Sequence, residues 1–122
     1  MKIRPLEFLV DGRPHARLAR VGCAERFLSR CRGLLGRPPP GKDEGLFIQP
    51  CSSVHTFGMR YPIDLVWLDR QGRILDLVPG LCPGRMAWRP GASAVLELAS
   101  GQIERLGLQP SMQTRWRPAC DR

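Results

Sequence analysis

The alternation of apolar and polar residues predicts a chain built mostly from short β-strands. Residues 6–10 are apolar except for Glu7, and residues 15–21 alternate in polarity. The Asp-Gly pair between them is a turn signal, so these two runs predict a β-hairpin. Residues 63–68 are apolar on both faces, which places this strand at the centre of a sheet. In an extended segment 51–59, every second residue from Cys51 to Met59 would share one face. Further short strands are expected at residues 45–49, 73–78, 92–99 and 111–116.

Two segments show a helical period instead. Residues 24–35 place apolar side chains at i, i+1, i+4, i+7 and i+8, counted from Phe27, which is one stripe of a helix. Residues 101–108 predict a short helical turn. The stretches 37–45 and 81–91 are rich in proline and glycine, so we expect loops there. The pattern indicates a mainly β or α+β domain, arranged as a small antiparallel β-barrel or sandwich with the longer helix over one end.

The length of 122 residues suits a single domain covering residues 1–122, with residues 117–122 as a loose tail. No window reaches the ~20 apolar residues that a membrane-spanning helix needs. The first residues, MKIRPLEFLVDGRP, carry charge and proline where a signal peptide needs an apolar run. We therefore expect a cytoplasmic protein without a membrane span.

The net charge of +8 raises the question of nucleic-acid binding. Only two of the 19 basic residues are lysine, and the arginines are scattered along the chain without a dense cluster or interleaved aromatic residues. This distribution is typical of a compositional bias over the whole chain. The sequence therefore argues against nucleic-acid binding as the main role, and basic-surface binding remains the third hypothesis.

Three blocks of the sequence resemble the DUF192 family, a group of small bacterial and archaeal domains. The segment CSSVHTFGMRYPIDLVWLD, from Cys51 to Asp69, is similar to the family's central aromatic-Met and Pro-Ile-Asp pattern. The stretch RCRGLL at residues 30–35 is similar to its R-x-R-G-L-M block, and VLEL at residues 95–98, followed by Gly101, to its V-L-E-L-x-x-G block. The resemblance implies a β-rich fold over roughly residues 15 to 116 and no assigned reaction.

Cys51, His55 and Asp64 are the residue types of a nucleophile, its base and an orienting acceptor. On a strand Cys51 and His55 would lie about 13 Å apart along one face, so they meet only if residues 52–54 turn. The same three residues, or Cys51 and His55 with Glu97, are also the donor types of an open zinc site, although their spacing matches no known ligand pattern. The structural alternative is a buried cysteine, a histidine bonded to the backbone and a capping aspartate. Five cysteines without a CxxC pair argue against a disulfide framework and a cysteine-rich zinc site.

Asp64 and Glu97 each place a carboxylate inside an apolar strand, which is costly unless the charge is paired. The expected partner is an arginine in bidentate geometry, and the candidates are Arg30, Arg32 and Arg60. An Asp64–arginine pair would clasp the helix to the sheet. Alternatively, the carboxylates would form the polar floor of a pocket that binds an anionic or amide-bearing ligand. The predicted polar cluster, structural or ligand-binding, consists of Arg32, His55, Arg60, Asp64 and Glu97.

Trp88 lies in the proline- and glycine-rich segment 81–91 between Arg85 and Arg89, so we expect it to be exposed and to contact a partner. The leading functional hypothesis is a non-catalytic binding or assembly-accessory domain with its site around residues 51–64. Its partner would be a small molecule or a protein, and we expect no cofactor. The alternative from a different class is a small hydrolase or transferase that uses Cys51 and His55, with or without a metal. Whether the protein is an enzyme stays open at this point.

Overall fold

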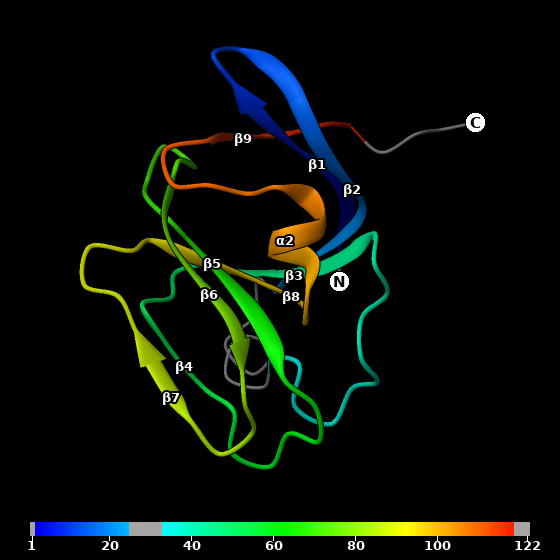
Figure 1. Ribbon diagram of the computed structural model, residues 1–122, viewed down its shortest axis with the longest axis vertical. Coiled ribbons are helices and arrows are strands. Elements are labelled where there is room, and N and C mark those ends of the chain that lie inside the picture. The colour runs from blue at the N-terminus through cyan, green and yellow to red at the C-terminus, as the bar shows by residue number, and fades with distance from the viewer. Residues whose placement is uncertain (1, 25–32, 119–122) are drawn as a thin grey trace.

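The computed structural model describes residues 2–24 and 33–118, and these residues form a large sheet, a small sheet and one short helix (Figure 1). The large sheet has seven strands in the order β6-β5-β8-β3-β2-β1-β9, and the small sheet pairs β4 with β7. The elements are β1 (Lys2–Val10), β2 (Arg13–Ala24), β3 (Glu44–Ile48), β4 (Ser53–His55), β5 (Ile63–Leu68), β6 (Ile74–Leu81), β7 (Met86–Trp88), β8 (Ala94–Ala99), α2 (Gln102–Leu106) and β9 (Gln113–Trp116).

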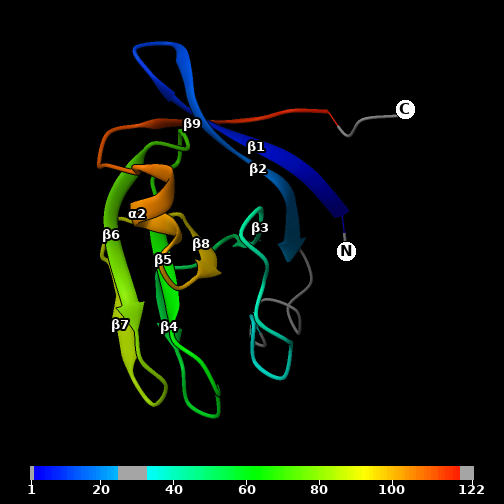
Figure 2. The same ribbon diagram turned by 45° about the vertical axis from the view of Figure 1, so that its right-hand side comes forward.

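The mainly β class predicted from the sequence is confirmed, but the sheet is mixed and does not close into a barrel. β2 and β3 run parallel, whereas the other neighbouring strands are antiparallel. Within the described residues a single isolated bridge, Arg73 to Gln113, links the β6 end of the sheet to β9. Figure 2 shows the bend of the sheet, in which β1 and β2 run at an angle to β5 and β6.

An apolar core lies on each face of the sheet, and the central strands contribute to both. On β5, Val66 and Leu68 join the core that contains α2, while Leu65 and Trp67 join the core beneath the small sheet. This division follows from the alternation of side chains along a strand. Every residue of β5 is buried, as expected for a strand that is apolar on both faces.

Several predicted elements differ from the observed ones. The segment 81–91 is not wholly a loop, because it contains the end of β6 and the strand β7, which pairs with β4. In the segment 51–59 only residues 53–55 form a strand. The predicted hairpin near the N-terminus and the helical turn near residues 101–108 are both present.

Most of the predicted helix 24–35 lies outside the described residues, and so does the end of the predicted tail. Ala24 belongs to β2, and the chain from Gly33 to Gly36 forms a turn. Within residues 2–24 and 33–118, no helix has the length and apolar character needed to cross a membrane.

Candidate functional site

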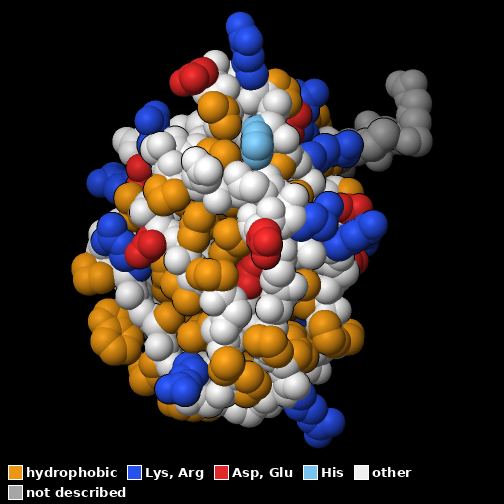
Figure 3. All heavy atoms as spheres, in the orientation of Figure 1, with side chains coloured by type: hydrophobic (Ala, Val, Ile, Leu, Met, Phe, Trp, Pro, Cys, Tyr) orange, Lys and Arg blue, Asp and Glu red, His pale blue; other side chains and the backbone are white. Residues whose placement is uncertain are grey.

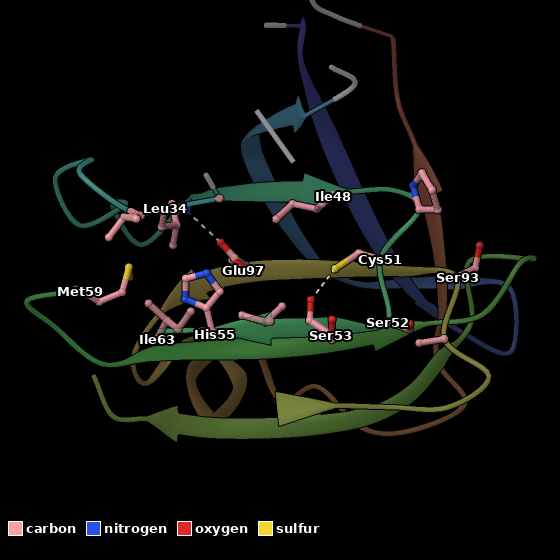
Figure 4. Close-up of a pocket in the computed structure, with 15 residues that line it drawn as sticks. Leu34, Ile48, Cys51, Ser52, Ser53, His55, Met59, Ile63, Ser93 and Glu97 are labelled. Carbon is pink, nitrogen blue, oxygen red and sulfur yellow. Dashed lines mark hydrogen bonds between the residues drawn. The ribbon is translucent and has the colours of Figure 1, made fainter. Parts of the chain in front are cut away.

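A cavity of about 570 Å³ lies between the main sheet and the segment that leads into β4 (Figure 4). The main sheet contributes residues of β3, β5 and β8 to its wall, and the turn that precedes β3 covers one side. The lining residues are Gly33, Leu34, Leu35, Ile48, Pro50, Cys51, Ser52, Ser53, Val54, His55, Met59, Ile63, Ala92, Ser93 and Glu97. Of the five residues expected to share one face of segment 51–59, four line the cavity, and Phe57 does not.

The segment around β4 lines the cavity with both buried and exposed side chains. The Cys51 backbone N–H donates to the Ser93 carbonyl at 3.1 Å, which fixes the start of the segment beside the main sheet. Val54 is buried in the core beneath the small sheet, whereas its neighbours Ser53 and His55, which also line the cavity, are exposed. Figure 4 shows the His55 ring on the same side of β4 as Glu97.

Glu97 is the only carboxylate among the described lining residues, and it is 3% exposed. It lies on β8 opposite Leu46 of β3 and Leu65 of β5, in a strand whose other residues are apolar. The Leu34 backbone N–H donates to Glu97 Oε1 at 3.2 Å. Burial raises the pKa of the Glu97 carboxyl to about 7, while the Leu34 hydrogen bond and the nearby Arg37 oppose this shift.

The turn that approaches Glu97 depends on a glycine. Gly33 has a φ of +53°, and a Cβ atom at this position would lie 3.0 Å from Glu97 Oε1. The turn is also tied to the segment after β4, because the Tyr61 hydroxyl donates to the Arg37 carbonyl at 3.0 Å. Any larger residue at position 33 would therefore push the turn away from the carboxylate.

Asp64 is not part of this cavity, although the sequence grouped it with Glu97. Its neighbour Leu65 faces the core on the cavity side, so Asp64 points to the opposite face of the sheet. There Asp64 Oδ1 accepts from the Gly80 N–H at 2.8 Å and Oδ2 from the Ile103 N–H at 2.9 Å. Ile103 is in the first turn of α2, so Asp64 supplies the acceptor that the start of this helix lacks locally.

The structure tests the predicted clasp between Asp64 and an arginine only for Arg60, and that pair is not formed. Backbone N–H groups donate to both carboxylate oxygens, and Asp64 forms no ion pair with a described side chain. Arg60 is exposed and does not line the cavity. Arg30 and Arg32 lie outside the described residues, so pairing of either with Asp64 or Glu97 stays a prediction.

The structure brings Cys51 and His55 to one cavity but not into a catalytic pair. The Cys51 thiol donates to the Ser53 carbonyl at 3.1 Å, and burial raises its pKa, with the Glu97 charge adding to the effect. His55 stacks on Phe57, with ring centroids 5.3 Å apart. No hydrogen bond joins the two side chains in the described part of the chain, and Figure 4 shows them at different ends of the lining.

The proposed metal ligands are also separated. Cys51 and His55 lie at the cavity, whereas Asp64 lies on the other face of the sheet. Across residues 2–24 and 33–118, no three His, Cys, Asp or Glu side chains come together in a group that would hold a metal ion. A zinc site made from Cys51, His55 and Asp64 is therefore inconsistent with the fold.

The segment around Trp88 presents large hydrophobic side chains to solvent. Trp88 is 65% exposed, Met86 55% and Phe57 50%. Ser53 pairs with Trp88 and His55 with Met86, so the exposed hydrophobic side chains share a face with two residues of the cavity. Figure 3 shows hydrophobic side chains gathered over β7.

The two arginines that flank Trp88 differ in their surroundings. Arg85 is exposed, whereas Arg89 is half-buried and lies 3.6 Å from the Asp76 carboxylate. Both arginines therefore reach solvent beside the exposed hydrophobic side chains, and Arg85 is the more exposed of the two.

Sequence reasoning missed the contribution of the turn at Gly33 and Leu34 and of Ser93. It placed Gly33 and Leu34 in the last turn of a helix, and it treated Ser93 as part of a strand. A signal for the turn was present, because Gly33 and Gly36 bracket Leu34 and both adopt positive φ. Ser93 gives no local signal, since its role depends on the Cys51 segment folding against it.

Comparison with known proteins assigns the fold to a family. The sequence model of DUF192, described as uncharacterized ACR, matches residues 9–116. The chain belongs to the DUF192 family. This confirms the resemblance seen in the sequence, and it brings no reaction with it, because the function of the family is not known.

Two solved structures have a similar fold. A protein of unknown function from Novosphingobium aromaticivorans DSM 12444 superposes with a TM-score of 0.81 at 22% identity, over 93% of this chain and 85% of that chain. A proposed transcription regulator from Sinorhizobium meliloti 1021 superposes with a TM-score of 0.83 at 21% identity, over 94% of each chain. At these identities the similarity concerns the fold alone. No curated protein matches the sequence.

Proposed function

We propose that this DUF192 domain is a non-catalytic binding protein that takes a small organic ligand in the cavity beside β4. The observation that carries the proposal is the cavity itself, with the buried carboxylate of Glu97 in a wall made of both aliphatic and polar side chains. Its volume of about 570 Å³ lies in the range of small-molecule sites, which combine hydrophobic surface with convergent polar groups.

The Cys51 thiol argues against the hydrolase or transferase alternative. A cysteine nucleophile reacts as the thiolate, which needs a lowered pKa and an adjacent base. Burial raises the pKa of Cys51 instead, and its proton is directed at the Ser53 carbonyl rather than at His55. Cys51 therefore serves this site as a wall residue.

Nucleic-acid binding is the remaining alternative, and the Sinorhizobium protein described as a proposed transcription regulator is a reason to test it. The net charge of +8 would favour it. However, no lysine or arginine is among the described residues that line the cavity. Several surface arginines face carboxylates instead, including Arg105 beside Asp43 and Arg115 beside Glu7. Retention on duplex or single-stranded DNA at low salt would revive this hypothesis.

The proposal is tested by screening small organic fragments against the labelled protein by NMR. We expect fragment binding to shift the amide signals of Leu34, of residues 51–55 and of Ser93. Ser53→Phe, which fills the cavity from an exposed strand position, is expected to abolish these shifts. The same substitution at the exposed Ser100 outside the cavity is the matched control. Fragments that bind equally well to Ser53→Phe, or the absence of any binding fragment, would refute the proposal.

A further inference from the structure

The two buried carboxylates of this chain are satisfied to different degrees. Both oxygens of Asp64 accept hydrogen bonds from backbone N–H groups, so the helix cap explains why this charge is buried. Glu97 accepts one hydrogen bond from a described residue, at Oε1 and at 3.2 Å. A carboxylate taken out of water needs further donors or a counter-charge, and the described residues supply only the Leu34 N–H, so with respect to them Glu97 can accept a further donor from the cavity.

The charges around the cavity leave that capacity to a ligand. None of the described lining residues is a lysine or an arginine. Arg37, the basic residue whose charge acts most on Glu97 among those described, donates from Nε to the Gly33 carbonyl at 3.0 Å and does not line the cavity. Among the residues that the structure describes, no positive charge inside the cavity answers Glu97, so the carboxylate is offered to a cation that enters, and Arg32, which lies outside the described residues, is the competing partner.

The wall on the Glu97 side of the cavity combines hydrocarbon with the His55 ring. Figure 4 shows Leu34, Ile63 and Met59 at this end of the cavity, with the His55 ring between Glu97 and Ile63. The serines at positions 52, 53 and 93 lie toward Cys51, at the other end of the lining. A ligand that matches this arrangement has a cationic group attached to an apolar body.

We propose that the cavity binds small organic amines, with the ammonium group donating to the Glu97 carboxylate and the hydrocarbon part packing against Leu34 and Ile63. This inference rests on the ligand-binding function proposed above and specifies the chemistry of the ligand. Charge-assisted hydrogen bonds are about twice as strong as neutral ones, which favours an amine over an alcohol or amide of the same shape. A bare metal ion fits poorly, because the described residues provide no group of three suitable ligands.

The ionisation of Glu97 supports the same conclusion. With a pKa of about 7, the carboxyl is about one-tenth ionised at one pH unit below this value and about nine-tenths ionised at one unit above it. Amine binding is therefore expected to strengthen about tenfold from about pH 6 to about pH 8. The other ionisable groups near Glu97 are Cys51, Tyr61 and Arg37, which act on it electrostatically, and His55, which lines the same cavity.

The experiment compares benzylamine with benzyl alcohol, which has the same shape without the positive charge, and with benzoate. Binding is followed by NMR titration at about pH 6 and pH 8, with the Leu34 amide as reporter because it donates to Glu97. We expect benzylamine to bind about tenfold tighter than benzyl alcohol at the higher pH, and benzoate to bind more weakly than either. Glu97→Gln is expected to remove the preference and the pH dependence. Glu104→Gln, an exposed carboxylate on α2, is the matched control and is expected to change neither.

The outcomes separate this inference from the proposed function. If benzyl alcohol and benzylamine bind equally well, or if Glu97→Gln keeps the preference for the amine, the cavity is a binding site but the amine inference is wrong. If no fragment of any class binds, both are wrong. A pH dependence that persists in Glu97→Gln belongs to another group and also overturns the inference. A further arm with N-acetyl-lysine methylamide tests the source of the ammonium group, since tighter binding of this probe than of benzylamine would assign it to a lysine of a protein partner.

Discussion

Replacing Glu97 by glutamine is expected to stabilise the folded protein above neutral pH and to change its stability little near pH 5. Burial raises the pKa of Glu97 from its usual value of 4.5 to about 7, so the folded state binds this proton more tightly than the unfolded state does. The contribution of Glu97 to stability is therefore most favourable below pH 4.5 and is lost as the pH rises through about 7. The difference of about 2.5 pH units corresponds to about 3 kcal/mol at high pH.

The assay is urea unfolding of wild type, Glu97→Gln and Glu104→Gln between about pH 5 and pH 8, followed by tryptophan fluorescence. Glutamine has the shape of a protonated glutamate and still offers an oxygen to the Leu34 N–H, so the low-pH comparison isolates the effect of the amide group. The free energy of unfolding of Glu97→Gln is expected to exceed that of wild type by up to about 3 kcal/mol at the upper end of the range. The free energy of unfolding of the control Glu104→Gln, at an exposed position, should depend on pH in the same way as that of wild type.

Two results would contradict this reasoning. If the free energy of unfolding depends on pH in the same way for wild type and Glu97→Gln, the Glu97 carboxyl has the same pKa in the folded and the unfolded state. A variant that becomes less stable than wild type as the pH rises would mean that Glu97 is held ionised by a positive charge. Arg32, which directly precedes the turn at Gly33, is then the partner to test, by asking whether Arg32→Gln removes the effect.

The remaining predictions concern residues other than Glu97. Asp64→Ala is expected to lower the free energy of unfolding by about 3 kcal/mol, because it leaves two backbone N–H groups without acceptors, and an unchanged urea midpoint would contradict the capping role. In the native protein, iodoacetamide is expected to modify the exposed Cys82 well before Cys51, as read by peptide mass spectrometry, and the difference should vanish in urea. Trp88→Phe is expected to remove most of the tryptophan emission that acrylamide quenches, because Trp67 is buried and Trp116 is partly buried, and unchanged quenching would show that Trp88 is covered in solution.

The elements that the sequence predicted well are those whose burial is decided by their own pattern. Residues 63–68 are apolar on both faces, and they form the buried β5 between two neighbouring strands. The hairpin of β1 and β2 follows from apolar runs on either side of a turn in which Asp11 and Gly12 both adopt positive φ. In these segments local propensity and tertiary packing agree.

The elements that the sequence missed depend on contacts between distant segments. β7 is three residues long and lies in a stretch rich in proline and glycine, so it has too few residues to show a period. It is a strand because its backbone pairs with β4, about thirty residues earlier in the chain. Nothing in either segment alone indicates this pairing, so the cavity wall that depends on it was not predicted, although the exposure of Trp88 was.

The candidate site shows the same limit in its two carboxylates. Asp64 and Glu97 look alike in the sequence, since each is one acidic residue within an apolar strand. Their strands are neighbours, but Asp64 lies opposite Leu98 and Glu97 opposite Leu65, so the two side chains emerge on opposite faces of the sheet. Asp64 lies at the start of α2, where backbone N–H groups need an acceptor, whereas Glu97 faces a cavity. The pleat of the sheet, rather than the residue type, therefore makes one carboxylate a helix cap and turns the other toward a cavity.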